Sequence, residues 1–439
     1  MKKIFIYFLL LTLLNCSFDN KTGIWNNETK VTKKEDRFKK FEALIIEKKT
    51  FNEVIPSAQN LKILFEPIRT VSKWTDVNYN NNNNLENFNY EGLNQIVFKS
   101  KKISRNIIDD NFLFDGENII ISDHKGNIIV YSLSNKNIIF KYNFYKKRFK
   151  KIKKKLNLII NDNVIYISDN IGFLYALNYA NGKLLWAKNY KIPFRSNIKI
   201  INNIIAVVDQ NNSLYFIDKF NGNRTKLFPT EESTLKNEFQ NTLSLKNDLF
   251  FLNTYGSLYS IDSKNYKINW FNNLNDSIDL NTGNLFFSNS LINYKNKIII
   301  STDPSLYILD SKTGSIIFKK QITSIIRPIV SADHLFLITK DNLLVSIDLF
   351  SGKVVYSVDI SQEIANFLNS KKKVINISNF FLTSNNLFII LNNSYFIKLN
   401  STGQIQEINR LSKQKTTNPI FINNKMFYFN KSNKLIILN

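Results

Sequence analysis

The sequence predicts an all-β fold, an eight-bladed β-propeller with four-stranded antiparallel blades, and three observations support this prediction. A short apolar strand recurs about every 40 residues, the length of one propeller blade. A turn with fixed spacing of polar, glycine and aromatic residues follows the stronger copies. The chain also ends in the middle of a repeat, and a strand that could complete this repeat lies before the first copy.

The recurring strand is clearest in five segments, whose successive starts are 40, 44, 48 and 38 residues apart. These segments are LYALN at Leu174, LYFID at Leu214, LYSID at Leu258, LYILD at Leu306 and LVSID at Leu344. Three weaker copies bring the total to eight, and they are VYSLS at Val130, FIKLN at Phe396 and LIILN at Leu435. The alternative, a two-sheet sandwich, would make the similarity between these strands fortuitous. The repeat therefore favours a ring of blades.

The residues Asn178, Gly182 and Trp186 show the pattern that follows the stronger copies. The Asx side chain can bond the turn backbone and the glycine can take a positive φ, so we expect a tight hairpin between two strands. We expect the aromatic residue to pack on the neighbouring blade. Two repeats depart from the pattern, because Tyr266 replaces the glycine in one and Lys226 replaces the aromatic residue in another.

The last copy stops at Asn439, before the turn and the outer strand of its blade. A propeller that ended there would leave an unpaired strand edge. Residues 95–103 resemble an outer strand of the repeat, with Phe98 in the aromatic position. The sequence therefore predicts that residues 95–439 form the propeller and that residues 95–103 close the ring by pairing with residues 434–439.

The N-terminus has the organisation of a secretion signal, with Lys2 and Lys3 before an apolar stretch that is too short to span a bilayer. Residues 1–15 are predicted to be a lipoprotein signal peptide, because the sequence Leu-Leu-Asn before Cys16 resembles a bacterial lipobox. Asn15 departs from the small residue usual at that position. We expect Cys16 to be lipidated; the alternative is an idle thiol behind an ordinary signal peptide.

Residues 16–94 are predicted to be an N-terminal tether and lead-in segment. They are polar and basic and show no copy of the repeat. Five consecutive asparagines, residues 80–84, lie within them. We expect residues 16 to about 70 to connect a membrane to the propeller.

The formal net charge of +24 would ordinarily suggest a nucleic-acid partner. The lysines are scattered over predicted loops, however, so we expect a solvated surface and no nucleic-acid binding. The two histidines, His124 and His334, stand 210 positions apart and each lies beside a predicted turn. No phosphate loop, nucleophile elbow or metal-ligand spacing is recognisable. The sequence thus predicts no catalytic residue, no metal and no cofactor.

The Asp/Asn, Gly and Trp repeat resembles that of the pyrroloquinoline-quinone-type propeller superfamily. Within it, residues 70–439 and the lipobox resemble the BamB family of outer-membrane protein assembly lipoproteins, in its alphaproteobacterial form. The resemblance implies a non-catalytic scaffold, lipid-anchored at the periplasmic face of the outer membrane. Its partners would be the outer-membrane barrel-assembly protein (BamA-like) and unfolded outer-membrane proteins.

The resemblance also implies residues that contact the partner. An exposed stretch with an apolar-x-apolar-Arg pattern is matched by Ile192, Phe194 and Arg195. An apolar anchor beside an arginine is a suitable hot spot, although the alternative is a locally packed Phe194 beside a solvated arginine. A second contact uses two carboxylates, of which Glu238 matches the first, whereas Gln240 stands at the second position.

Two other classes of protein remain as alternatives. Quinone-dependent periplasmic dehydrogenases share the repeat, and resemblance to them would imply adjacent cysteines and a calcium ion held by carboxylate and amide oxygens. Cys16 is the only cysteine of this chain, so the cysteine pair is missing. A general periplasmic protein-interaction propeller is the other alternative, because the fold alone does not assign a partner.

Overall fold

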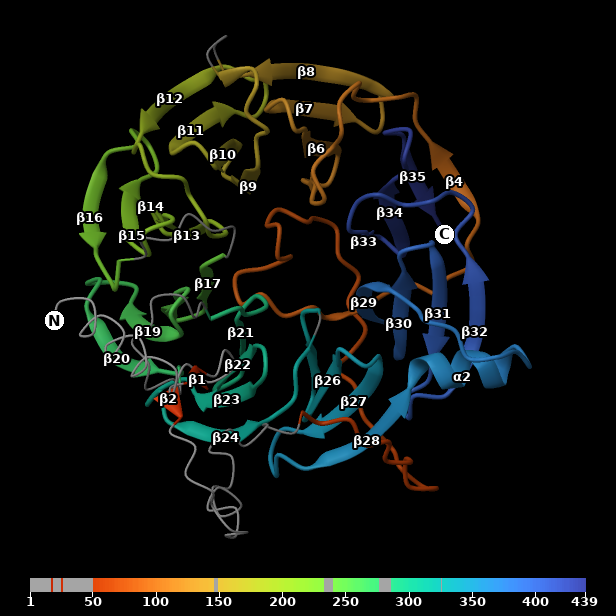
Figure 1. The fold of residues 1–439 in the computed structure, drawn as a ribbon. Helices are drawn as coiled ribbons and strands as arrows, with labels where there is room; N and C mark the ends of the chain where they lie inside the picture. Colours follow the sequence, from red (N-terminus) through yellow and green to blue (C-terminus); the bar gives the residue numbers. More distant parts are fainter. Residues whose placement is uncertain are drawn as a thin grey trace, which may run out of the picture. The chain divides into compact units, whose positions relative to one another are not determined.

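The computed structural model describes residues 17–18, 25–26, 50–145, 149–232, 240–275, 286–324 and 326–439. The chain divides into two compact units, Met1–Lys49 and Thr50–Asn439. In the first unit, β1 (Ser17–Phe18) pairs with β2 (Trp25–Asn26) in antiparallel fashion. The second unit is a ring of eight antiparallel blades (Figure 1), which confirms the predicted eight-bladed propeller.

The first two strands of each blade lie nearest the axis of the ring (Figure 1). The innermost strands are β5 (Leu113–Phe114), β9 (Leu156–Asn161), β13 (Lys199–Ile201), β17 (Thr242–Leu245), β21 (Ile292–Tyr294), β25 (Ile329–Ser331), β29 (Ile377–Thr383) and β33 (Ile420–Ile422). The second strands are β6 (Asn118–Ser122), β10 (Val164–Asp169), β14 (Ile204–Val208), β18 (Asp248–Leu252), β22 (Lys297–Ser301), β26 (His334–Ile338), β30 (Asn386–Leu391) and β34 (Lys425–Phe429).

The eight predicted copies of the repeat all form third strands. These are β7 (Asn127–Ser132), β11 (Phe173–Asn178), β15 (Leu214–Asp218), β19 (Ser257–Asp262), β23 (Leu306–Asp310), β27 (Leu343–Asp348), β31 (Tyr395–Leu399) and β35 (Leu435–Leu438). The outer strands are β8 (Asn137–Asn143), β12 (Leu184–Asn189), β16 (Arg224–Phe228), β20 (Ile268–Asn273), β24 (Ile316–Lys320), β28 (Val354–Asp359), β32 (Ile405–Arg410) and β4 (Ile96–Lys99). A helix, α2 (Ile360–Phe367), follows β28 and is capped by Asp359.

The first and last strands of the propeller pair with each other, as predicted. Strand β4 pairs antiparallel with β35, so that Phe98 lies opposite Ile437 and Lys99 opposite Ile436. The amide of Asn439 donates to the carbonyl of Gln95 at 3.0 Å. The last blade therefore takes its outer strand from the start of the domain, and no blade is left with three strands.

The aromatic residue of the repeat packs on the turn of the next blade, which confirms that expectation. A Cβ atom on Gly222, whose φ is +70°, would lie 2.4 Å from the ring of Trp186 in the preceding blade. The indole Nε1 of Trp186 also donates to the carbonyl of Lys219 at 2.9 Å. Two reasons therefore require glycine at position 222: its positive φ, and the ring of Trp186 that leaves no room for a Cβ atom. Gly182 under Phe140, Gly314 under Trp270 and Gly352 under Phe318 repeat the arrangement.

The two departures from the repeat compensate each other, because they meet at one blade interface. Lys226 carries no ring to cover the next turn, and Tyr266 stands in that turn at the glycine position. The Nζ of Lys226 donates to the carbonyl of Tyr266 at 2.5 Å. The ring of Tyr266 lies 4.7 Å from that of Phe216, so it covers the interface that an aromatic residue at position 226 would have covered.

Residues 71–88, here called the central loop, cross the axis of the ring (Figure 1, orange). Trp74 and Phe114 of the first blade exchange two backbone hydrogen bonds, at 2.7 and 2.9 Å. The carbonyl of Thr75 accepts from Ile160 in the second blade at 3.0 Å. At the other end of the loop, β3 (Asn87–Phe88) pairs in parallel with β29 of the seventh blade. The carbonyl of Val71 accepts from Asn423 in the eighth.

The five asparagines, residues 80–84, form hydrogen bonds with the third to sixth blades. The carbonyls of Asn81 and Asn82 accept from the amides of Leu245 and Asn293, in the fourth and fifth blades. The side chain of Asn83 donates to both Leu243 and Leu291 at 2.8 Å. The side chain of Asn84 forms two hydrogen bonds with the backbone of Val330 in the sixth blade, one as donor and one as acceptor. Asparagine suits this position because its amide offers a donor and an acceptor, as a peptide group does.

A buried ion pair fixes the central loop to the third blade. The Nζ of Lys199 lies 2.7 Å from the carboxylate of Asp76, and the side chain of Lys199 is 0% exposed. The same ammonium donates to the carbonyl of Asn80 at 2.8 Å. Burial lowers the pKa of Lys199, and the charge of Asp76 opposes that decrease.

Replacing Lys199 by Met should destabilise the propeller by about 3 to 5 kcal/mol, because the carboxylate of Asp76 would remain buried without its partner. Adding Asp76→Asn should recover a large part of that loss, since no charge is then left unpaired. Urea unfolding of the two single variants and the double variant measures the coupling. Additive losses would show that the two groups do not act as a pair.

Candidate functional site

The structure brings the two predicted contact segments together, although they are 45 residues apart in sequence. The carbonyl of Arg195 accepts from the amide of Asn241 at 2.9 Å. Arg195 and Gln240 line the same pocket, of about 340 Å³, which we call the Arg195 pocket. Gln240 is exposed and Ile192 is half-buried. Glu238 and Cys16 lie outside the described residues, so their predicted roles remain predictions.

Phe194 is buried within the chain, with an exposed fraction of 2%. Its ring lies 5.6 Å from that of Tyr190 and 5.9 Å from that of Tyr215, both at steep angles. Its backbone amide donates to the carbonyl of Asp169 at 3.0 Å. The ring therefore anchors this segment to the second and third blades and sets the position of the neighbouring Arg195.

Arg195 is held at both its backbone and its side chain. Its amide donates to the carbonyl of Val208 at 2.9 Å, and its Nη2 lies 3.3 Å from Oε1 of Gln210. Arg195 is half-buried and is one of the residues that line the pocket. A planar cation that is positioned before binding can pair with a carboxylate at a small cost in side-chain entropy.

Across the Arg195 pocket lie two titratable groups, Asp109 and His124, whose Oδ1 and Nε2 atoms are 3.4 Å apart. Burial raises the pKa of Asp109 to about 6, although the hydrogen bond from Ser122 lowers it. Burial and the nearby charge of Lys153 lower the pKa of His124. The exposed side chains of Lys153 and Lys155 also line the pocket, so its charge at neutral pH is predominantly positive.

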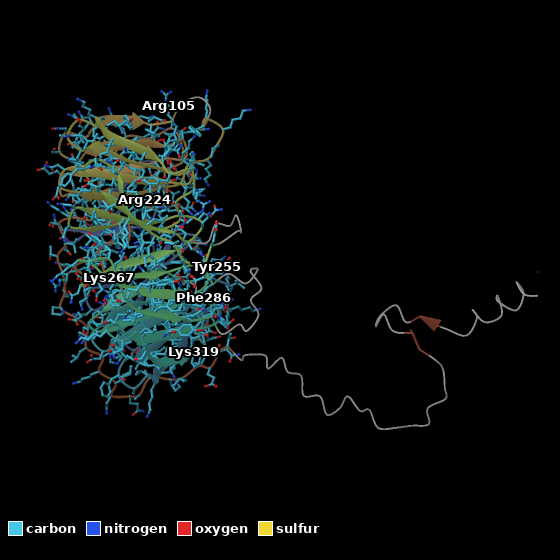
Figure 2. The ribbon with its side chains drawn as sticks, turned by 90° about the vertical axis from the view of Figure 1, so that its left-hand side faces the viewer. Arg105, Arg224, Tyr255, Lys267, Phe286 and Lys319 are labelled. Atoms are coloured by element: carbon cyan, nitrogen blue, oxygen red, sulfur yellow. The ribbon has the colours of Figure 1, made fainter. Side chains whose placement is uncertain are left out.

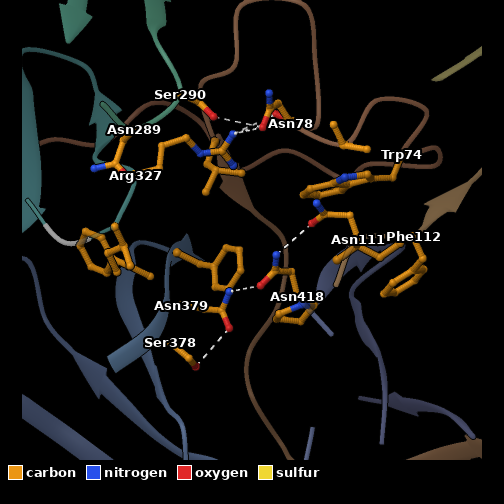
Figure 3. Close-up of a pocket in the computed structure, with 17 residues that line it drawn as sticks. Trp74, Asn78, Asn111, Phe112, Asn289, Ser290, Arg327, Ser378, Asn379 and Asn418 are labelled. Atoms are coloured by element: carbon orange, nitrogen blue, oxygen red, sulfur yellow. Dashed lines mark hydrogen bonds between the residues drawn. The ribbon is translucent and has the colours of Figure 1, made fainter. Parts of the chain in front are cut away.

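A second depression, here called the central cavity, lies on the axis of the ring. The central loop forms one of its walls through Trp74, Val77, Asn78 and Leu85, and the starts of innermost strands form the others (Figure 3). Sequence reasoning missed these residues. The signal that could have found them is an asparagine near the start of most innermost strands, which only the strand register makes visible.

The central cavity does not match the donor set that resemblance to quinone-dependent dehydrogenases would imply. Its described lining contains no Asp or Glu, and the chain has a single cysteine. Among all residues placed in the structure, no group of three or more His, Cys, Asp and Glu side chains could hold a metal ion. We therefore assign no reaction step to a quinone or a metal here.

The closed ring and its aromatic and glycine turns define the class of quinone-type β-propellers. Within it the chain belongs to the family described as "Outer membrane protein assembly factor BamB", which matches residues 159–279 and 289–433, more than half of the sequence. Comparison with curated protein sequences finds no match.

Solved structures with the same fold include a BamB protein and two dehydrogenases. BamB from Moraxella catarrhalis aligns with a TM-score of 0.60 at 14% identity, over 78% of this chain and 98% of the other. The quinohemoprotein alcohol dehydrogenase from Comamonas testosteroni aligns with a TM-score of 0.60 at 10% identity, over 81% and 76%. A europium-containing methanol dehydrogenase gives 0.59 at 12%, over 83% and 89%. At such identities the likeness concerns the fold alone. No helix within the described ranges is long and apolar enough to cross a membrane.

The raised pKa of Asp109 predicts a stability effect that depends on pH. In the unfolded chain this carboxyl ionises near its usual pKa of 3.8, whereas in the folded chain it ionises near 6. The folded state is therefore penalised as pH rises from about 4 to 6, and the penalty is complete above that range. Asp109→Asn should stabilise the protein by about 2 to 3 kcal/mol at pH 7.5.

This gain should fall to about 0.5 kcal/mol at pH 4, because the folded carboxyl is then protonated and the unfolded one, with its pKa of 3.8, is close to half protonated. Urea unfolding at the two pH values measures it. Asp341→Asn, at an exposed aspartate, is the matched control. An equal effect of Asp109→Asn at both pH values would contradict the prediction.

Proposed function

We propose that this protein is a non-catalytic scaffold lipoprotein of the outer-membrane β-barrel assembly machinery. It would bind the barrel-assembly protein and aid the delivery of unfolded outer-membrane proteins. The observation that carries the proposal is the match to the BamB assembly-factor family over more than half of the chain. The sequence of the signal segment supports the same assignment, because it ends in a lipobox-like motif at Cys16.

The partner contact in this proposal is the rim of the Arg195 pocket. Arg195 supplies a positioned guanidinium, and the exposed Gln240 lies on the same rim. Because Phe194 is covered by Tyr190 and Tyr215, its role in the proposal is to position Arg195 and not to insert into the partner. The positive rim suits a partner surface with carboxylates.

Arg195→Glu should reduce copurification of the barrel-assembly protein roughly tenfold, because the reversed charge would repel the carboxylates it is proposed to meet. Arg224→Glu is the matched control, since Arg224 is exposed on outer strand β16 (Figure 2). Equal copurification with wild-type protein and the Arg195→Glu variant would refute this contact.

A photo-crosslinking amino acid at Gln240 identifies the partner directly, because this side chain is exposed beside Arg195. In living cells it should capture the barrel-assembly protein, whereas the same group at position 224 should not. Capture of unrelated periplasmic proteins alone would favour a general interaction propeller. A quinone absorbance band in the purified protein would favour the dehydrogenase class.

The lipid anchor is tested separately. Cys16→Ser should move the protein from the membrane fraction to the soluble periplasmic fraction, because the acylated thiol would be its attachment. The urea unfolding midpoint of the propeller should stay unchanged. Retention of the variant in the membrane fraction after a high-salt wash would show that Cys16 is not the anchor.

A further inference from the structure

The central cavity is surrounded by side chains from all eight blades, at corresponding places near the start of the innermost strands. Asn157, Asn197 and Asn379, for example, each stand four residues before the residue that closes the first hairpin of their blade. We call this set the amide ring, and its members are Asn111, Asn157, Asn197, Asn241, Ser290, Arg327, Asn379 and Asn418.

Part of the hydrogen-bonding capacity of the amide ring joins the blades to one another. The side chain of Asn379 donates to that of Asn418 at 2.8 Å, and Asn418 donates to Asn111 at 2.9 Å (Figure 3). The side chain of Asn197 likewise exchanges two bonds with the backbone of Leu243 in the next blade. Asn241, at 2% exposure, keeps a buried Oδ1 atom with no hydrogen-bond partner among the described residues. A buried acceptor without a donor is costly, and a ligand N–H group would remove that cost.

Arg327 gives the cavity its charge. Its Nη1 makes two long contacts with Asn78, to the carbonyl at 3.3 Å and to Oδ1 at 3.4 Å (Figure 3). No carboxylate of a described residue lies within 4.0 Å of the guanidinium, since Asp76 is bound to Lys199. Burial lowers the pKa of Arg327 to about 10, which still leaves it charged at neutral pH. The charge of Asp76 opposes that decrease, but Asp76 is already bound to Lys199. Two enclosed cations thus share one carboxylate, and such a site attracts a further anion.

The cavity is also partly apolar and of limited size. Trp74, Phe112 and Phe380 line the part that contains Arg327, whose volume is about 290 Å³. The adjoining part, lined by Asn157, Asn197 and other amides, has a volume of about 460 Å³. The two parts share Asn78, so one elongated ligand can occupy both. Volumes of this order suit a few residues of extended peptide.

We propose that the central cavity binds a carboxylate-bearing peptide segment, whose carboxylate pairs with Arg327 and whose amide groups bond to the amide ring. Side-chain amides match peptide groups because each offers a donor and an acceptor. An inorganic anion would use Arg327 but would leave the Oδ1 atom of Asn241 without a donor. The adjoining part of the cavity shares Asn111, Asn157 and Gln240 with the Arg195 pocket. The carboxylate, however, would pair with Arg327 and not with Arg195, so the peptide proposal can hold even if the contact at Arg195 fails.

The test is calorimetric titration of the purified protein with an acetylated tripeptide that ends in a leucine carboxylate. The same peptide with a C-terminal amide is the matched ligand control. The carboxylate form should bind at least roughly tenfold more tightly, because only it can pair with the guanidinium. Acetate should displace it only at concentrations more than tenfold higher, because acetate lacks peptide groups.

Arg327→Gln should abolish the difference between the two peptides, whereas Arg224→Gln, which removes the same charge from the outer wall, should preserve it. Circular dichroism establishes that both variants fold. Equal binding of both peptides to wild-type protein, or no binding of either, would overturn the proposal. Displacement of the carboxylate peptide by acetate at an equal concentration would also overturn the proposal. The comparison of the two peptides and the competition with acetate both use wild-type protein. They therefore test the proposal even if the Arg327→Gln variant does not fold.

Discussion

The structure depends on how the backbone groups that face the axis of the ring are satisfied. Eight innermost strands each turn an edge of N–H and C=O groups towards the centre, where neighbouring blades cannot reach them. The central loop lies there and bonds to one blade after another, from Phe114 in the first to Asn423 in the eighth. Its asparagines supplement their own peptide groups with side-chain amides, as Asn83 does for Leu243 and Leu291. A segment that looks like a polar linker in sequence therefore forms the hub of the propeller.

This hub also decides which surfaces are available for binding. Because the central loop crosses the axis, the ring is not an open channel but carries a cavity with Trp74 and Asn78 in its wall. The buried pair of Lys199 and Asp76 holds the loop in place and leaves Arg327 nearby without a carboxylate of its own. The charge of the central cavity is thus a consequence of how the loop is anchored.

Interfaces between neighbouring blades follow a second rule, in which a ring from one blade covers a glycine of the next. Trp186 on Gly222 is one example, whereas at the interface of Lys226 and Tyr266 both positions depart from the repeat. These contacts join the outer strand of one blade to the turn of the next. The carbonyl of Arg195 bonds to Asn241 across one such junction, which brings together the residues of the proposed partner surface. The two proposed sites share part of their lining, including Gln240, but use different cations, Arg327 and Arg195, and are tested by different ligands.

The number of blades, the identity of each third strand and the closure of the ring by residues 95–103 were all predictable from the repeat, because a repeat of fixed period reflects local strand and turn chemistry. The sequence also predicted that the aromatic residues would pack between blades. It did not reveal that the five asparagines bond to the innermost strands, since those contacts join residues more than 100 positions apart. Nor did it reveal that Phe194 is buried while Arg195 and Gln240 share one rim. Burial and long-range neighbours arise only when the blades close into a ring, so tertiary structure alone decided the central cavity and the amide ring.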